Sequence, residues 1–212
     1  ENGEIDAGPM PISDTFRLES ISQPVAGFCL AVTNRSGSSF LFSKEPISQL
    51  NGVPIGVAAE AGASRDLLRV ILALKHDVRP EAFVSLDDSP PAFLLTGNQA
   101  LRRRRGLREY PNKYDLGEEW HTWTGLPFVF ARWMRRNDLS EKDAALLEDT
   151  LYVGLEDGVD GLYHLSEPRE NLLMLAKDIL EYIQGVRYFI GFSEQKAINL
   201  FRNYLEQAGD SV

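Results

Sequence analysis

The chain contains 212 residues, of which 43% are hydrophobic and 25% charged, and its 31 acidic and 22 basic side chains give a net charge of −9. This is the composition of a folded globular protein, and a net negative charge of this size repels nucleic acids and anionic membranes. The single cysteine, Cys29, excludes an internal disulfide as well as cysteine-rich zinc and iron–sulfur sites. No apolar run reaches the roughly 18–20 residues that cross a bilayer, so we expect no membrane span.

The N-terminal part of the sequence predicts strands joined by turns. Residues 26–32 form an apolar run that is typical of a buried strand, and residues 40–42 resume an extended apolar run. Between them, residues 34–39 are rich in Asn, Ser and Gly, which favours a turn. This part of the chain is therefore expected to contribute strands.

The middle of the sequence alternates strands with helices. Residues 53–58 and 92–96 predict strands, and a helix is expected between them over residues 64–74, where leucine and isoleucine recur close to helical spacing. A further short strand is predicted at residues 83–86. Strands that alternate with helices indicate an α/β unit.

The C-terminal part is rich in predicted helices. Ser140, Ser166 and Ser193 are each typical of a helix start, and the last helix is expected to end near Gln207. Pro168 falls in the first turn of the second of these helices, which is a favourable position for proline.

The strand-rich start and the helix-rich end indicate that the α/β unit is inserted into a second lobe. The sequence therefore predicts an α/β protein in which residues 1–43 and 125–212 form lobe 1 and residues 44–124 form lobe 2. Crossing strands near residues 34–43 and 124–133 are expected to join the lobes. A cleft between two lobes is where small ligands usually bind.

Small residues surround the start of the helix predicted at residue 64. Gly62 and Ala63 leave room for an anion to approach the free N–H groups of a helix start, and Ser64 adds a hydroxyl donor. A carboxylate or a phosphate suits such a site. The alternative is that Ser64 only caps the helix and that Gly62 only forms a turn.

Two further polar turns are candidate ligand contacts. Gly97 permits close approach of a ligand after a predicted strand, and Asn98 offers both a donor and an acceptor. Ser38 and Ser39 lie at a predicted crossing, where two adjacent hydroxyls can hold a carboxylate. A turn cap explains Asn98 equally well, and loop solvation is the common role of such serines.

Metal and nucleic-acid sites are not expected. Glu118 and His121 have a spacing that places two ligands on one helix face, but the chain does not repeat the pair. The arginines at 102–105 and 108 lack the interleaved aromatic residues of single-strand binders, so we expect a solvated helix face. Nucleophile-elbow, P-loop and dinucleotide-binding motifs do not occur.

A longer motif resembles a known family. The sequence DLGEEWHTWTGLPFVFARW at residues 115–133 resembles the signature of the menaquinone-biosynthesis family that contains chorismate dehydratase. The motifs GEIDAGP at residues 3–9, LNG at residues 50–52 and GNQAL at residues 97–101, with Ser64 at a helix start, follow the same order as in that family. The resemblance covers nearly the whole chain.

This resemblance implies a fold similar to the type II periplasmic binding proteins, with two α/β lobes joined by crossing strands. It also implies a cytoplasmic lyase of the futalosine route to menaquinone, which removes water from chorismate to give 3-[(1-carboxyvinyl)oxy]benzoate without a metal or organic cofactor. A sister branch of the family cleaves cyclic dehypoxanthine futalosine to 1,4-dihydroxy-6-naphthoate. The implied partner is a small-molecule dicarboxylate.

A dicarboxylate suits the candidate residues. Gly62, Ala63, Ser64, Ser38 and Ser39 are expected to hold its carboxylates, and Asn98, Thr124 and Gly125 are expected to line the opposite wall. The elimination makes the ring aromatic, so holding the ring and its leaving hydroxyl in geometry is the expected source of catalysis. The sequence assigns no catalytic acid or base.

The chain departs from the family at three points. The family begins with a further strand–helix–strand segment that carries an active-site asparagine, and lobe 1 is expected to lack this segment. The family commonly has Asp where this chain has Asn98, and it favours Ser and Thr hydroxyls where Gly62 and Ala63 stand. The alternative function is therefore a non-catalytic small-carboxylate binding protein, or a subunit of a larger assembly, with the same fold.

Overall fold

The computed structural model describes residues 5–86, 89–162 and 164–209, so Gly3 and Glu4 of the N-terminal motif lie outside the described residues. The strands are β1 (Ala7–Pro11), β2 (Ser22–Val32), β3 (Ser39–Ser43), β4 (Ile55–Val57), β5 (Phe83–Val84), β6 (Ala92–Thr96), β7 (Asn112–Asp115), β8 (Phe128–Arg136) and β9 (Val186–Phe189). The helices are α1 (Ile12–Arg17), α2 (Gly62–Val70), α3 (Gly97–Arg102), α4 (Leu116–Thr124), α5 (Glu141–Leu162), α6 (Ala176–Gln184) and α7 (Phe192–Ala208). Short 3-10 turns η1 (Ile47–Gln49), η2 (Ala59–Ala61) and η5 (Glu170–Leu172) and a π-helical turn η3 (Ile71–Lys75) complete the order.

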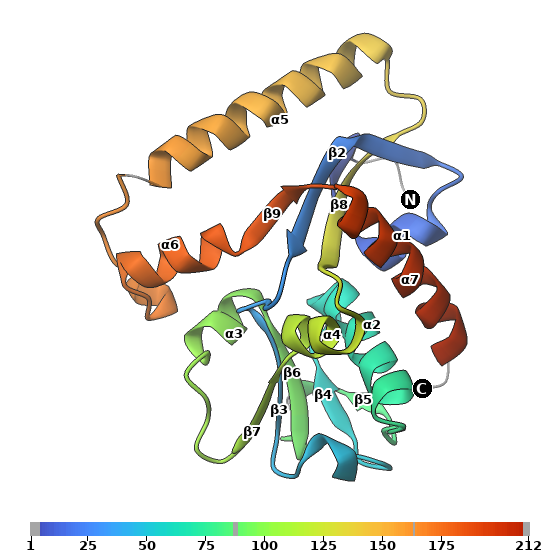
Figure 1. The fold of residues 1–212 in the computed structure, drawn as a ribbon, viewed down its shortest axis with the longest axis vertical. Coiled ribbons are helices and arrows are strands. Elements are labelled where there is room, and N and C mark those ends of the chain that lie inside the picture. Colours follow the sequence, from blue (N-terminus) through green and yellow to red (C-terminus); the bar gives the residue numbers. More distant parts are fainter. Residues whose placement is uncertain (1–4, 87–88, 163, 210–212) are drawn as a thin grey trace.

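Lobe 1 is built on an antiparallel sheet with the strand order β1-β8-β2-β9. Helices α1 and α7 pack on β8, where Phe16 of α1 and Phe128 of β8 both contact Phe201 of α7. Burial of these rings accounts for much of the hydrophobic contact between the helices and the sheet. Figure 1 shows this lobe above lobe 2, with α5 at its outer side.

Lobe 2 is built on a mixed sheet with the strand order β5-β4-β6-β3-β7. β4 pairs in parallel with β5 and β6, and α2 with η3 supplies the helical crossover that follows β4. β3 runs antiparallel to β6 and β7. The carboxyl ends of β4 and β6 therefore meet at one edge of the sheet, and Figure 1 shows that this edge faces lobe 1.

Helix α4 fixes the boundary between the lobes. Trp120 of α4 is fully buried, and its indole N–H donates a hydrogen bond to the carbonyl oxygen of Pro127 at 2.9 Å. Its ring also makes edge contacts with Phe128 of β8 and Phe201 of α7. One hydrophobic core consequently includes residues of both sheets.

The two-lobe α/β fold predicted from the sequence is confirmed. β3 belongs to the sheet of lobe 2, although the predicted boundary placed residues 39–43 in lobe 1. The described residues include no helix that is long and apolar enough to cross a membrane.

The helix predicted from Ser166 is wrong. Residues 166–175 hold the turn η5 instead, and the next helix begins at Ala176. Arg169 and Met174 pair as an isolated bridge, and Leu173 adopts a φ of +54°, which a helix cannot accommodate. Met174 is buried against Leu101 of α3, so packing on lobe 2 overrides the local helix-start signal.

Candidate functional site

The edge of lobe 2 that faces lobe 1 collects the starts of two helices. β4 and β6 are adjacent and parallel, η2 and α2 follow β4, and α3 follows β6 directly. Ligands of open α/β sheets bind at such an edge, where helix starts expose backbone N–H groups. The structure thus brings the predicted residues 62–64 and 97–98 to the same edge.

The start of α2 carries no side-chain cap. Ala61 occupies the N-cap position, and none of the side chains in the described part of the chain caps the helix. Gly62 has a φ of +47°, and a Cβ built there would lie 3.3 Å from Pro11 Cγ of lobe 1, so backbone geometry and close approach both favour glycine. The interpretation of Ser64 as an N-cap is therefore wrong, and the first-turn N–H groups remain available to an anion.

Two buried hydroxyl groups have no hydrogen-bond partner among the described residues. They are Ser39 Oγ at the start of β3 and Ser13 Oγ in α1, whose residues are 2% and 5% exposed. An unpaired buried hydroxyl costs about 1–3 kcal/mol, which makes it a candidate for a functional role. α1 packs against α2, and Pro11 just before α1 lies beside Gly62, so Ser13 adds a buried lobe 1 hydroxyl close to this contact that was not predicted from the sequence.

The neighbouring hydroxyl of Ser38 is already engaged. Ser38 Oγ accepts a hydrogen bond from the Tyr182 hydroxyl of α6 at 3.0 Å and donates one to the Ser36 carbonyl oxygen at 3.4 Å. The same loop is held by Asp115, whose carboxylate accepts hydrogen bonds from the Ser36 and Gly37 N–H groups at 2.8 Å each. Binding of a carboxylate by the Ser38 hydroxyl would therefore require its hydrogen bond to the Ser36 carbonyl oxygen to break, because a carboxylate needs the same donor.

The residues predicted for the opposite wall lie at the ends of helices and strands. Thr124 Oγ1 donates to the Trp120 carbonyl oxygen at 2.9 Å, and Gly125 ends α4 with a φ of +70°. Gly97 has a φ of +54°, and its N–H donates to the Ser38 carbonyl oxygen at 2.8 Å. Asn98 is exposed in the first turn of α3.

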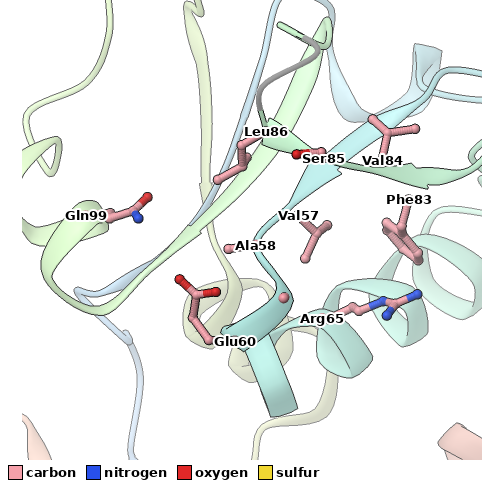
Figure 2. Close-up of a pocket in the computed structure, with 10 residues that line it drawn as sticks. Val57, Ala58, Glu60, Arg65, Phe83, Val84, Ser85, Leu86 and Gln99 are labelled. Carbon is pink, nitrogen blue, oxygen red and sulfur yellow. The ribbon is translucent and has the colours of Figure 1, made fainter.

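A pocket of about 450 Å³ opens beside the α2 start. Its lining includes Glu60, Arg65, Phe83 and Gln99, and Figure 2 shows Glu60 and Gln99 on one side with Arg65 and Phe83 on the other. The Arg65 guanidinium lies 5.2 Å from the centroid of the Phe83 ring, which is a cation–π distance. The pocket thus combines one cation, one carboxylate, an amide and an aromatic face.

Two of these lining residues, Arg65 and Gln99, are direct neighbours of residues predicted from the sequence and were not themselves predicted. Arg65 directly follows Ser64, and Gln99 directly follows Asn98. Successive residues of a helix point about 100° apart, so one step in sequence changes which side chain reaches the pocket. The available signal was an arginine and an amide in the first turns of helices that follow parallel strands.

The side chains of Cys29, Arg35 and His121 do not contribute to this pocket. Burial raises the pKa of the Cys29 thiol to about 12, and the nearby Glu194 adds to this effect, so the thiol is not a nucleophile at neutral pH. Arg35 pairs with Glu118 at 3.5 Å, and His121 Nδ1 lies 3.3 Å from the Leu126 carbonyl oxygen. Within the described ranges, no group of three or more His, Cys, Asp or Glu residues is placed to hold a metal.

Comparison with known proteins identifies the family. Residues 1–207 match the model of a family described as menaquinone biosynthesis. The chain belongs to the menaquinone biosynthesis family. The resemblance inferred from the motifs is therefore confirmed, and membership of the menaquinone biosynthesis family supports a chorismate dehydratase-like role in general.

Solved structures share the fold of this menaquinone biosynthesis family member. Protein AF1704 from Archaeoglobus fulgidus has a TM-score of 0.70 at 16% identity, over 98% of this chain and 81% of that one. The ligand binding component of an ABC-type import system from Staphylococcus aureus has a TM-score of 0.56 at 11% identity, over 97% and 74%. An ABC transporter protein from Parabacteroides distasonis has a TM-score of 0.55 at 17% identity, over 96% and 75%.

Proposed function

We propose that this protein binds chorismate at the lobe boundary and eliminates water from it in the cytoplasm, giving 3-[(1-carboxyvinyl)oxy]benzoate. The observation that carries the proposal is the uncapped α2 start beside a pocket that holds Arg65. Membership of the menaquinone biosynthesis family supplies the reaction class. The α2 start and Arg65 provide two positively polarised groups for a ligand with two carboxylates.

The two anionic ends of chorismate have different partners in this proposal. One carboxylate binds the first-turn N–H groups of α2 and the Ser64 hydroxyl, where the helix dipole favours negative charge. The other binds Arg65, whose planar guanidinium can hold a carboxylate through two parallel hydrogen bonds. The Phe83 ring faces the Arg65 guanidinium and limits the directions that the guanidinium can take.

The elimination itself needs no oxidant. A proton leaves a ring carbon, its bonding electrons enter the ring, and the hydroxyl leaves the adjacent carbon, so the departing atoms amount to one water molecule. Glu60 supplies a carboxylate at the pocket that can accept the ring proton. Holding the ring between this carboxylate and Arg65 provides the orientation that makes an intramolecular-like step fast.

The direct test is incubation of the purified protein with chorismate, followed by chromatography for the benzoate product and by the shift in melting temperature. The proposal expects product from the wild type and neither product nor a melting shift from Arg65→Gln. Arg79→Gln is the matched control, because Arg79 is an exposed arginine of the same lobe away from the pocket. Equal turnover in both variants would remove Arg65 from the site.

The second candidate is carboxylate binding without turnover, either as a binding protein or as a subunit of an assembly. It is favoured by the neighbour from Staphylococcus aureus, which is a ligand binding component of an import system. It is also favoured by Gly62 and Ala63, which offer an anion backbone contacts without hydroxyls. A melting shift with chorismate but no product would support this candidate over the enzyme.

A further inference from the structure

One face of α5, far from the candidate site, is both apolar and acidic. Leu146 and Val153 are seven residues apart and are 63% and 56% exposed. Asp149, Glu156 and Asp160 are exposed on the same face, because residues three or four apart lie together on a helix. Figure 1 shows α5 at the periphery of the molecule, so this acidic face is accessible to another protein. Apolar side chains gathered on an exposed face mark interaction surfaces.

The charge of α5 restricts what can cover this face. The helix contains one basic residue, Lys142, and several acidic residues, at positions 141, 143, 148, 149, 156, 157 and 160. Two such helices repel each other when they are brought side by side. The complementary partner is therefore a basic surface that also exposes apolar groups.

The same molecule carries a basic surface at the end of α3. Arg103, Arg105 and Arg108 are exposed, and residues 102–109 hold five arginines against Glu109. This local positive charge stands out on a chain whose net charge is −9. An arginine cluster on an acidic protein is suited to an acidic protein partner.

Apolar side chains are exposed on a segment that Arg104, within the same run of arginines, holds in place. Leu173 and Leu175 are 67% and 54% exposed. Arg104 holds their segment against the end of α3, since it donates to the Leu173 carbonyl oxygen at 2.8 Å and to Asp178 at 2.9 Å. The arginine surface, defined as Arg103, Arg105, Arg108, Leu173 and Leu175, therefore matches the acidic face of α5 in both charge and apolar content.

We propose that the acidic face of α5 in one copy docks onto the arginine surface of a second copy. Two different surfaces meet, so the contact is head-to-tail and each bound copy still offers one free surface. Growth beyond two copies follows unless the rotation between copies closes a ring. Because opposite charges drive the contact, it weakens as ionic strength rises.

The test uses light scattering on the full chain, whose single copy has a mass of 23.8 kDa. The mass of the wild type should rise with concentration at low salt and return to that of one copy at high salt. Asp149→Lys with Glu156→Lys, and separately Arg103→Glu with Arg105→Glu, should each stay at one copy. Glu45→Lys with Glu81→Lys is the matched control, because it makes the same change of charge at exposed sites outside both surfaces and should associate like the wild type.

Mixing the two reversed variants gives the sharpest outcome. The first keeps an intact arginine surface and the second an intact α5, so an equimolar mixture should form dimers although each variant alone stays at one copy. Leu146→Gln with Val153→Gln leaves the charge unchanged and should also abolish association, with helical circular dichroism showing that the fold is kept. A wild type that stays at one copy at every concentration, a mixture without dimers, or self-association of the arginine-reversed variant would overturn the proposal.

Discussion

The two sides of the lobe boundary use their polar groups differently. On the side of the crossing loop and α4, called the hinge side, Asp115 accepts four backbone hydrogen bonds. Ser38 is hydrogen-bonded to Tyr182, and Thr124 to the Trp120 carbonyl oxygen. On the α2 side, the helix start has no cap, and Ser13 of the adjacent α1 buries a hydroxyl that has no partner among the described residues. The polar groups named on the hinge side are used in hydrogen bonds that hold the structure, whereas those named on the α2 side can still bind a ligand.

This difference separates positions that hold the lobes from positions that can act on a ligand. Folded proteins satisfy nearly all of their buried polar groups, so those left over at a cleft indicate a site. Substitutions on the hinge side should therefore change stability, and substitutions on the α2 side should change ligand binding at nearly constant stability.

Trp120→Ala should have the largest effect on stability. It removes a fully buried indole that contacts both lobes, and its loss leaves a large cavity and an unpaired Pro127 carbonyl oxygen. We expect a loss of about 3–5 kcal/mol in the free energy of unfolding. Urea denaturation followed by circular dichroism measures it, and a loss below about 1 kcal/mol would show that α4 does not join the lobes.

Asp115→Ala should come next, at about 3 kcal/mol. Asp115 is 4% exposed, and its loss leaves four backbone N–H groups of the crossing loop and α4 without their acceptor. The matched control is Ser140→Ala at the exposed start of α5, where the cap hydrogen bond to Asp143 N–H should be worth about 1 kcal/mol. Equal losses in the two variants would contradict the special role of the hinge side.

Glu119→Gln should give a pH-dependent loss of stability. Burial alone would raise the pKa of Glu119, but hydrogen bonds from Lys75 at 2.7 Å and His76 at 3.0 Å lower it below the usual 4.5. A carboxylate with a lowered folded-state pKa contributes stability above its unfolded pKa and loses it as pH falls through the folded value.

The difference between wild type and Glu119→Gln should therefore be full at neutral pH, about 2 kcal/mol, and should shrink once the pH falls below about 4.5. Melting temperatures of the two proteins across pH 3–7 measure it. A constant difference across this range would mean that the ion pair does not contribute through its charge.

Arg65→Gln should have the smallest effect on stability, within about 0.5 kcal/mol, because the side chain is exposed. Its effect should appear instead in the chorismate-dependent rise in melting temperature, which we expect to disappear. A variant that loses stability but keeps the ligand response would show that Arg65 holds the structure, as the hinge-side residues do, and does not bind the ligand.

Local patterns in the sequence predicted much of the fold. Apolar runs and helical spacing located β4, β6, α2 and α7 within a few residues, because these elements bury a face that is visible in their own sequence. The exception was the segment after Ser166, whose helix-start pattern yields to the packing of Met174 on lobe 2.

The site was less predictable because its polar groups are paired over long distances in sequence. Tyr182 lies 144 residues from Ser38, and Asp115 lies 79 residues from Ser36, so no local pattern could show that the crossing loop is already bonded. The burial of Ser13 also depends on how α1 packs against α2, and the pocket position of Arg65 depends on how α2 packs beside β5. The sequence could indicate the edge of the sheet, and tertiary contacts decide which side chains remain free there.

Binding of chorismate at the α2 start is tested by its affinity for the wild type, Ser64→Asp and Ser64→Ala, measured by isothermal titration calorimetry. Aspartate at this position places a negative charge at the α2 start and should repel the carboxylate, whereas alanine keeps the backbone N–H groups and should bind with modest loss. Chorismate should bind the wild type and Ser64→Ala and should not bind Ser64→Asp. Equal affinity in all three proteins would show that chorismate does not bind at the α2 start.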